Sequence, residues 1–232
     1  MNQETNGVTL VNPHLTRQAD IIPSTTLHTP VTIIGAGAIG SFLALSLAKM
    51  GMTDITVYDF DDVSIENMNN QFYRFKDIGK PKVIALRDLI EDFTGVQITT
   101  VNGRFEPRHV SKHRGILVTA ADTMATRRMV HTALAGYHML SHIIDPRMGA
   151  ELFVQCTINP TSKKDMDMWD VLLFDDSNAA PVRCTAKSTI YTATLAAGHV
   201  VKTIKNILLN EPHPRHMTWA INKSEDCFES VQ

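Results

Sequence analysis

The segment comprising residues 31–59 restricts the fold of this chain more than any other part of the sequence. It opens with a short, β-branched run at 31–34, which is typical of a strand buried on both faces. Three glycines, Gly35, Gly37 and Gly40, follow with the spacing G-x-G-x-x-G. Small and apolar residues then repeat at helical intervals from 38 to 50. This order predicts a strand, a tight turn and a helix that starts directly after the turn.

The same segment continues with a predicted strand at 55–58 that ends on Asp59. The glycines allow backbone N–H groups to approach a phosphate, and the N-terminus of the following helix favours negative charge. Asp59 lies about twenty residues beyond the glycines, where an acidic residue can bind a ribose hydroxyl. The segment therefore predicts a nucleotide site. The alternative is a Rossmann-like core whose site is empty.

Composition and charge describe an ordinary globular protein. Of 232 residues, 44% are hydrophobic and 20% charged, and the net charge is −2, so neither nucleic acid nor an anionic membrane is an expected partner. We find no signal peptide at the N-terminus and no apolar run long enough to span a membrane, and we expect a cytosolic protein. The three cysteines form no C-x-x-C pair, so neither a disulfide framework nor zinc is expected.

Strands and helices alternate through most of the remaining chain, which predicts a Rossmann-like, doubly wound, mostly parallel α/β sheet. In this part we expect helices at 82–93 and 123–135, the second capped by Asp122, and strands at 96–101, 115–120 and 139–145. The later chain has a different pattern. There we expect a late antiparallel hairpin of strands at 151–159 and 169–174, a long helix at 188–209, and an edge strand at 217–221.

A second motif begins at the end of the second predicted strand. The run 59–82, DFDDVSIENMNNQFYRFKDIGKPK, resembles the D-x-D-x-V-x-x-x-N-x-x-R-Q … G-x-x-K signature of the ThiF/MoeB/HesA family, adenylating enzymes related to ubiquitin-activating enzymes. The positions that match are Asp59, Asp61, Val63, Asn67, Gln71, Gly79 and Lys82. Further along, ILVTAADT at 116–123 resembles the family strand that ends in T-D-N, and Arg17-Gln18 resembles the N-terminal R-Q. The resemblance extends to the late helix.

The resemblance implies an ATP-binding adenylation domain at 30–210, between an N-terminal arm at 1–29 and a tail at 211–232. In the implied reaction a carboxylate attacks the α-phosphate of ATP and pyrophosphate leaves, which requires positioning and cations more than covalent help. The carboxylate would be the C-terminus of a small ubiquitin-like or sulfur-carrier protein. Arg17 would reach the ATP of a partner subunit, which implies a homodimer.

The resemblance also assigns roles within the site. Lys82 would contact the phosphates, Asp59 the ribose and Asp122 a magnesium ion. The other expected nucleotide contacts are Gly35, Gly37, Ala38, Ile39, Gly40, Asp61, Asn67, Asn70, Gln71 and Thr123. Structural alternatives remain open: a solvated lysine for Lys82, a helix cap for Asp122 and a loop charge for Asp61.

One position departs from the family pattern. The family has an arginine before Gln71, whereas this chain has Asn70, and a neutral amide binds and stabilises phosphate charge less well than a bidentate cation. Arg74 is a possible substitute. The C-x-x-C pairs common among bacterial relatives are also missing.

The roles of Cys184 and Arg147 each have two interpretations. RCTAK at 183–187 resembles the segment around the thioester-forming cysteine of ubiquitin-activating enzymes, and cations beside Cys184 would lower its pKa. The alternative is a small buried residue. Cys156 is expected in the core and Cys227 in the tail, and Arg147 either lines the channel for the acceptor peptide or forms a scaffolding salt bridge.

Three functions therefore compete. The first is ATP-dependent adenylation, with thioester transfer to Cys184 as a possible second step. The second is an NAD-binding oxidoreductase, which leaves the 59–82 signature unexplained and has no evident catalytic pair. The third is a degenerate scaffold that binds nucleotide without turnover, as the Asn70 departure would allow.

Overall fold

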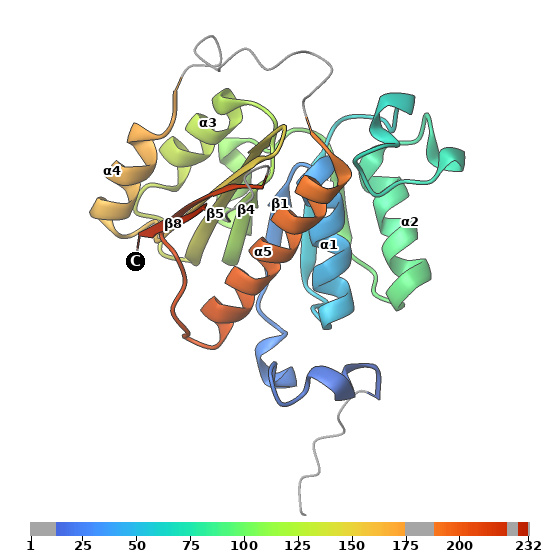
Figure 1. Cartoon of the computed structure of the whole chain (residues 1–232), viewed down its shortest axis with the longest axis horizontal. Helices are drawn as coiled ribbons and strands as arrows, with labels where there is room; N and C mark the ends of the chain where they lie inside the picture. Colours follow the sequence, from blue (N-terminus) through green and yellow to red (C-terminus); the bar gives the residue numbers. More distant parts are fainter. Residues whose placement is uncertain (1–12, 175–187, 222–226, 232) are drawn as a thin grey trace, which may run out of the picture.

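The computed structural model describes residues 13–174, 188–221 and 227–231 of the chain. Its centre is an eight-stranded sheet with the strand order β3-β2-β1-β4-β5-β6-β7-β8 (Figure 1). The first five strands in this order are mutually parallel, and the last three pair antiparallel. The strands are β1 (Val31–Ile34), β2 (Ile55–Asp59), β3 (Thr99–Asn102), β4 (Gly115–Thr119), β5 (Leu140–Gly149), β6 (Leu152–Ile158), β7 (His216–Ala220) and β8 (Cys227–Val231).

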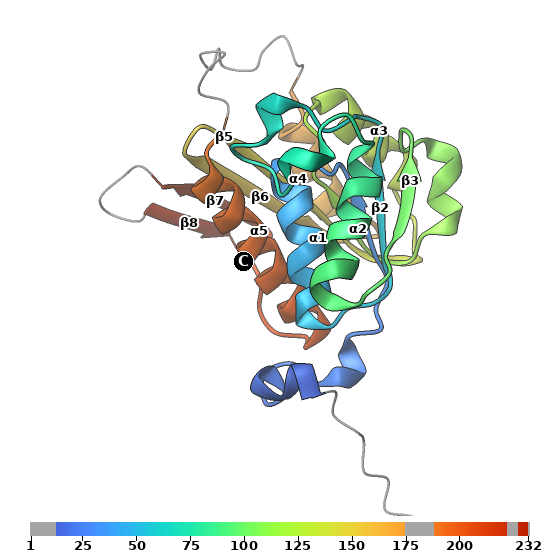
Figure 2. The same cartoon turned by 90° about the vertical axis from the view of Figure 1, so that its right-hand side faces the viewer.

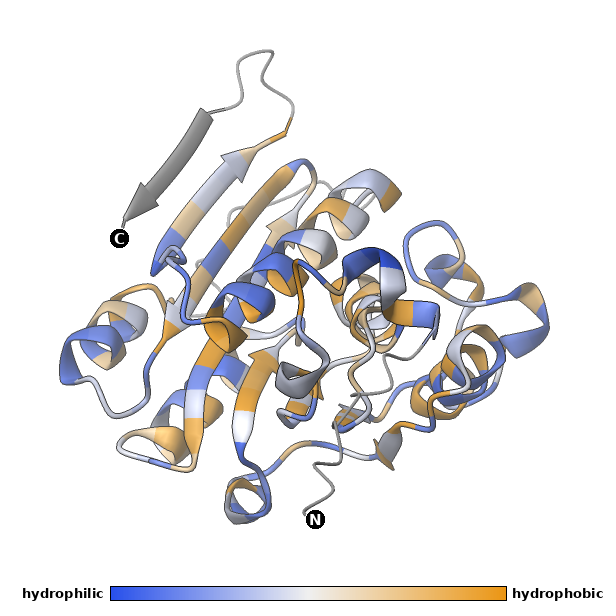
Figure 3. Cartoon of the chain, turned by 90° about the horizontal axis from the view of Figure 1, so that it is seen from below, coloured by the Kyte–Doolittle hydropathy of each residue, from blue (hydrophilic) through white to orange (hydrophobic). Residues whose placement is uncertain are grey.

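Helices cover both faces of the sheet. On one face lie α1 (Ala38–Met50), α2 (Lys82–Thr94) and α5 (Ile190–Leu208), and on the other α3 (Met124–Leu134) and α4 (Lys163–Val171) (Figures 1 and 2). Two buried clusters follow from this arrangement, one on each face. In Figure 3 the hydrophobic residues concentrate on the strands and on the helix sides that face them. The predicted doubly wound sheet, with late antiparallel strands and a long late helix, is confirmed.

The sequence of β1 explains why the sheet can be covered on both sides. All four of its residues are buried, because β1 is a central strand between β2 and β4 and helices cover both faces of the sheet. The chain passes from β1 outward to β2 and β3, and then returns to the far side of β1 to form β4. The strand order therefore reverses between β1 and β4, and in open α/β sheets ligands bind at such a point.

Several predicted elements differ from the structure. The run at 169–174 is not a strand: α4 extends to Val171 and buries Met166 and Trp169, which lie three residues apart on one helix face. The antiparallel part is built from β5, β6, β7 and β8 instead. Consequently β7 is not an edge strand, since β8 pairs with it, and β3 starts at Thr99 rather than at residue 96.

The described part of the N-terminal arm, residues 13–29, contains two short 3-10 helices, η1 (Pro13–Gln18) and η2 (Ser24–Thr26). The arm lies beside the C-terminal end of α1 (Figure 2): the Gln18 side-chain amide donates to the Met50 carbonyl at 2.5 Å. Among the helices that the structure describes, none is both long and apolar enough to cross a bilayer.

Candidate nucleotide site

The glycine turn forms directly after β1. Gly35 has a φ of +101°, a backbone region that favours glycine, and its N–H donates to the Tyr58 carbonyl of β2 at 2.8 Å. A Cβ atom on Gly40 would lie 1.9 Å from the Gly35 carbonyl oxygen, so only glycine allows the first turn of α1 to approach this closely. At Gly37, by contrast, a Cβ atom would meet no atom within 4 Å. The turn is therefore tight on the helix side and open at Gly37.

The ends of β1 and β4 bring the glycine turn near Asp122. A Cβ atom on Gly35 would lie 2.5 Å from the Ala120 carbonyl oxygen, so the residues that follow the two strands are in contact. Asp122 lies two residues beyond Ala120 and is exposed. Both lie at the carboxyl edge where the strand order reverses. In residues 13–174 and 188–221, no three His, Cys, Asp or Glu side chains cluster to hold a metal ion.

Asp59 is bonded to the glycine turn itself. Its Oδ2 accepts the Ala36 N–H at 2.6 Å, its Oδ1 accepts the Asp61 N–H at 2.8 Å, and the residue is only 9% exposed. Burial raises the pKa of Asp59 above its ordinary value, although the two N–H groups and Lys82 counteract the rise. A carboxylate offers about four lone-pair positions, so two remain for a ligand hydroxyl.

Lys82, the first residue of α2, is buried rather than solvated. Its Nζ lies 3.0 Å from Asp61 Oδ2, and its side chain is 8% exposed whereas that of Asp61 is 48% exposed. Its backbone N–H also donates to the Asp61 carbonyl, at 2.9 Å. A chain of contacts thus joins the glycine turn, Asp59, Asp61 and Lys82, and it holds an ammonium group beside two carboxylates.

Residues 67–71 hold the loop between β2 and α2 in place. The Asn67 Oδ1 accepts the Ser64 N–H at 3.0 Å and so caps a short helix, η3 (Ile65–Asn67). The Asn70 side-chain amide donates to Ser188 Oγ, just before α5. One side-chain oxygen of Asn70 and one of Gln71 are buried with no partner in the part of the chain that is described. Buried acceptors normally have donors, so these two oxygens suit a water or a ligand hydroxyl.

Arg74 is engaged in ion pairs and is therefore not available to replace the family arginine. Its guanidinium bonds to Asp77 at 2.7 Å and to Asp92 at 2.9 Å, and the Asp77 side chain is fully buried. Arg74 is also the N-cap residue of the short helix η4 (Phe75–Asp77), and Asp77 Oδ2 accepts the Arg74 backbone N–H at 3.2 Å. The structure therefore favours a scaffolding role for Arg74.

Sequence reasoning missed Tyr73. The Tyr73 hydroxyl donates to the Ala36 carbonyl at 2.6 Å, while the neighbouring Phe72 N–H donates to Ser41 Oγ in the first turn of α1 at 3.0 Å. Tyr73 therefore contacts the glycine turn across 37 residues of sequence. No local pattern signals such a bond, because it depends on how the loop folds back over α1.

The N-cap of α3 is Thr123, not Asp122 as predicted: Thr123 Oγ1 accepts the Thr126 N–H at 3.3 Å. Below it, Asp145 is completely buried and accepts from Arg127 at 2.7 Å and from Arg147 at 2.6 Å. The structure thus favours the salt-bridge alternative for Arg147. Since Arg127 also donates to the Thr123 carbonyl, this cluster ties the start of α3 to β5.

The remaining predicted residues lie apart from the turn. Arg17 sits in η1 near the C-terminal end of α1, a 13-residue helix that is about 20 Å long, so it does not reach the glycine turn of the same chain. Cys156 is buried in the core as expected, and burial raises its pKa to about 12. Cys184 lies outside the described residues.

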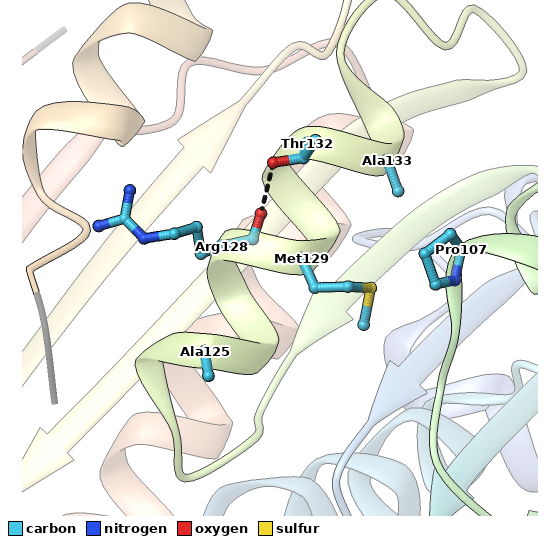
Figure 4. Close-up of a pocket in the computed structure, with 6 residues that line it drawn as sticks. All are labelled: Pro107, Ala125, Arg128, Met129, Thr132 and Ala133. Carbon is cyan, nitrogen blue, oxygen red and sulfur yellow. Dashed lines mark hydrogen bonds between the residues drawn. The ribbon is translucent and has the colours of Figure 1, made fainter.

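A hollow of about 450 Å³ lies elsewhere, between the outward side of α3 and Pro107 (Figure 4). Met129 and Ala133 project into it, and the Arg128 guanidinium points away toward α4. It contains none of the predicted site residues, so we place the candidate site at the glycine turn.

Comparison with known proteins agrees with the motifs. The NEDD8-activating enzyme E1 catalytic subunit of Arabidopsis thaliana is 30% identical over 111 residues, which cover 46% of this chain and 24% of that protein. Adenylyltransferase and sulfurtransferase MOCS3 of Dictyostelium discoideum is 31% identical over 111 residues, 46% of this chain and 26% of that protein. The chain thus spans about a quarter of the length of these relatives.

The fold also matches a solved structure, that of E. coli MccB with ATP. The TM-score is 0.73 at 16% identity, over 95% of this chain and 71% of that one, a likeness that concerns the fold alone. The family model described as the ThiF family matches residues 24–232. Because this match covers most of the sequence, the family predicted from the motifs is confirmed, and the chain belongs to the ThiF family.

Proposed function

We propose that this chain binds ATP and adenylates the C-terminal carboxylate of a small ubiquitin-like or sulfur-carrier protein. The observation that carries the proposal is the contact chain from the glycine turn through Asp59 and Asp61 to the buried Lys82. In this chain of contacts the open glycine turn can bind phosphate, the Asp59 carboxylate can bind the ribose, and the Lys82 ammonium can balance the phosphate charge. The names of two relatives, a NEDD8-activating enzyme and an adenylyltransferase and sulfurtransferase, support the substrate class.

In the proposed reaction the carrier carboxylate attacks the α-phosphate, the bond to the bridging oxygen breaks, and pyrophosphate leaves. The chain's part is to fix both reactants and to stabilise charge on the phosphates. Lys82 supplies positive charge, the N-terminus of α1 supplies backbone dipoles, and Asp59 orients the ribose. When bound, magnesium would neutralise phosphate charge; it is usually held by one or two carboxylates plus substrate phosphates, which a single exposed Asp122 fits.

Two further features belong to the proposal. Because Arg17 lies at the far end of α1, we assign it to the site of a partner subunit in a homodimer. In a second step, the Cys184 thiolate would attack the carbonyl carbon of the acyl adenylate, forming a thioester as AMP leaves. Both features rest on the family resemblance and are tested below.

The first experiment is calorimetric titration with Mg–ATP and, separately, with NAD. We expect Mg–ATP to bind more tightly, because Lys82 and Asp122 have no evident use for a dinucleotide. Tighter binding of NAD would overturn the proposal. Exchange of labelled pyrophosphate into ATP then tests adenylation, with a candidate carrier that ends in Gly-Gly. ATP binding without exchange would instead identify a degenerate scaffold.

Asp122→Ala is the matched test of the site, with Asp167→Ala as the control. Both are exposed acids, but Asp167 pairs with Lys163 on α4. We expect Asp122→Ala to abolish exchange with little loss of stability, because Thr123 is the helix cap. A folded, fully active Asp122→Ala protein would remove Asp122 from the proposed site.

A further inference from the structure

We propose that Tyr73 is a positioning residue that fixes the peptide between Ala36 and Gly37, so that the Gly37 N–H faces the phosphates of the nucleotide. This inference rests on the proposed function, because it concerns how the same turn holds ATP. It starts from the two bonds that hold Ala36. Asp59 accepts its N–H at 2.6 Å, and Tyr73 donates to its carbonyl at 2.6 Å.

Peptide geometry gives the direction of the Gly37 N–H. The peptide unit is planar and trans, so the Ala36 carbonyl and the Gly37 N–H point in opposite directions. With the carbonyl held toward Tyr73, the N–H must point away from that side chain. No partner for the Gly37 N–H is found in the described residues, and the space where a Gly37 Cβ would lie is open. An unpartnered N–H before a helix start is a donor for an anion.

The surroundings of Tyr73 keep its hydroxyl a donor. Burial raises the pKa of Tyr73 well above 10, and the charges of Asp59 and Asp61 raise it further, so the phenol stays protonated across the working pH range. The backbone of the same loop is fixed to α1 by the bond from Phe72 to Ser41. Glycine turns can adopt alternative peptide orientations because glycine is permissive. A bond to the carbonyl selects one of them.

The test compares Tyr73→Phe with Tyr137→Phe. Tyr137 makes the same type of bond, from its hydroxyl to the His113 carbonyl at 3.1 Å, but at a site away from the glycine turn. Each variant keeps the ring and removes one hydroxyl. For each protein we would measure the Kd of Mg–ATP, the Kd of adenosine, the KM for ATP and kcat in the exchange assay, and the Tm.

We expect Tyr73→Phe to weaken Mg–ATP binding about three- to tenfold, as the loss of one hydrogen bond predicts, with adenosine binding unchanged. The KM for ATP should rise by the same factor at constant kcat, because the phosphate contact is made in both the ground and the transition state. Tyr137→Phe should leave both affinities unchanged. A general structural defect would weaken ATP and adenosine binding together.

Two results separate this inference from the proposed function. If the wild-type chain binds Mg–ATP no more tightly than adenosine, the proposed function fails and the inference fails with it. If the wild-type chain prefers Mg–ATP and Tyr73→Phe keeps the full preference, the inference alone is wrong.

Discussion

Asp145→Asn removes the charge at the centre of the buried cluster beneath α3 and keeps the side-chain shape. In the wild-type chain the carboxylate has no exposed surface and receives bonds from Arg127, Arg147 and the Trp169 indole N–H. The two arginine side chains are only 5% and 14% exposed, so water cannot replace the lost partner. Leaving a buried charge without its counter-ion costs about 3–5 kcal/mol of unfolding free energy. For a chain of this size that corresponds to a fall in Tm of about 6–20 °C.

Urea denaturation at pH 7, followed by circular dichroism, measures this loss, and Asp167→Asn is the control. Asp167 also pairs with a cation, Lys163 at 2.6 Å, but the two side chains are 62% and 87% exposed. Exposed pairs contribute little, so the control should stay close to the wild-type chain. A loss below about 1 kcal/mol for Asp145→Asn would refute the reasoning, because it would place the variant in the range of exposed pairs.

The difference in unfolding free energy between the wild-type chain and Asp145→Asn depends on pH, and its direction follows from the pKa shift of Asp145. Burial alone raises the pKa of Asp145, but the two guanidinium groups outweigh it and hold the pKa below its ordinary value. The unfolded chain therefore binds this proton first as the pH falls. The stabilisation by Asp145 is complete above about pH 4, the unfolded pKa, and is lost as the pH falls through the folded pKa. The difference in unfolding free energy between the wild-type chain and Asp145→Asn should decrease only in that acid range.

Three further predictions concern the site. Asn70→Arg should strengthen Mg–ATP binding about tenfold or more, because it restores a charged contact to phosphate. Arg74→Ala should leave exchange nearly unchanged, because Arg74 already pairs with Asp77 and Asp92. If Asn70→Arg has no effect and Arg74→Ala abolishes exchange, Arg74 and not residue 70 contacts the phosphates. Mixing Arg17→Ala with Lys82→Ala should recover part of the exchange activity if sites are completed by the partner subunit, and an active monomer by light scattering would contradict this. Cys184→Ser should abolish any thiol-sensitive adduct with the carrier while exchange persists, and an adduct that survives the change would remove Cys184 from the proposal.

The sequence predicted the elements whose signals are local. The glycines, the helix at 38–50 and Asp59 lie within one βαβ unit, so their spacing fixes their geometry. The prediction of a strand at 169–174, where α4 ends, is wrong because short apolar runs fit either a strand or a helix. Ser162 gave a usable signal, since it caps α4 by accepting the Asp165 N–H.

The roles of individual side chains depended on contacts between distant segments. The alternatives for Arg147 could not be decided from sequence, because Asp145 is also bound by Arg127 from another element. Tyr73 gave no signal for the same reason, since its partner belongs to the glycine turn. Burial of Lys82 likewise depends on how Asp61 and α2 pack.

The glycine turn places two consecutive amide groups in opposite surroundings. The Ala36 N–H is held by a buried carboxylate, whereas no bond in the described chain holds the Gly37 N–H. Amide hydrogens exchange with solvent at rates that depend on such local protection. In the free protein the hydrogen at Ala36 should therefore exchange slowly and that at Gly37 quickly. A phosphate bound on the turn would slow exchange at Gly37 and leave the already protected Ala36 unchanged. The ratio of the two exchange rates therefore reports whether the turn is occupied, without a label on the ligand.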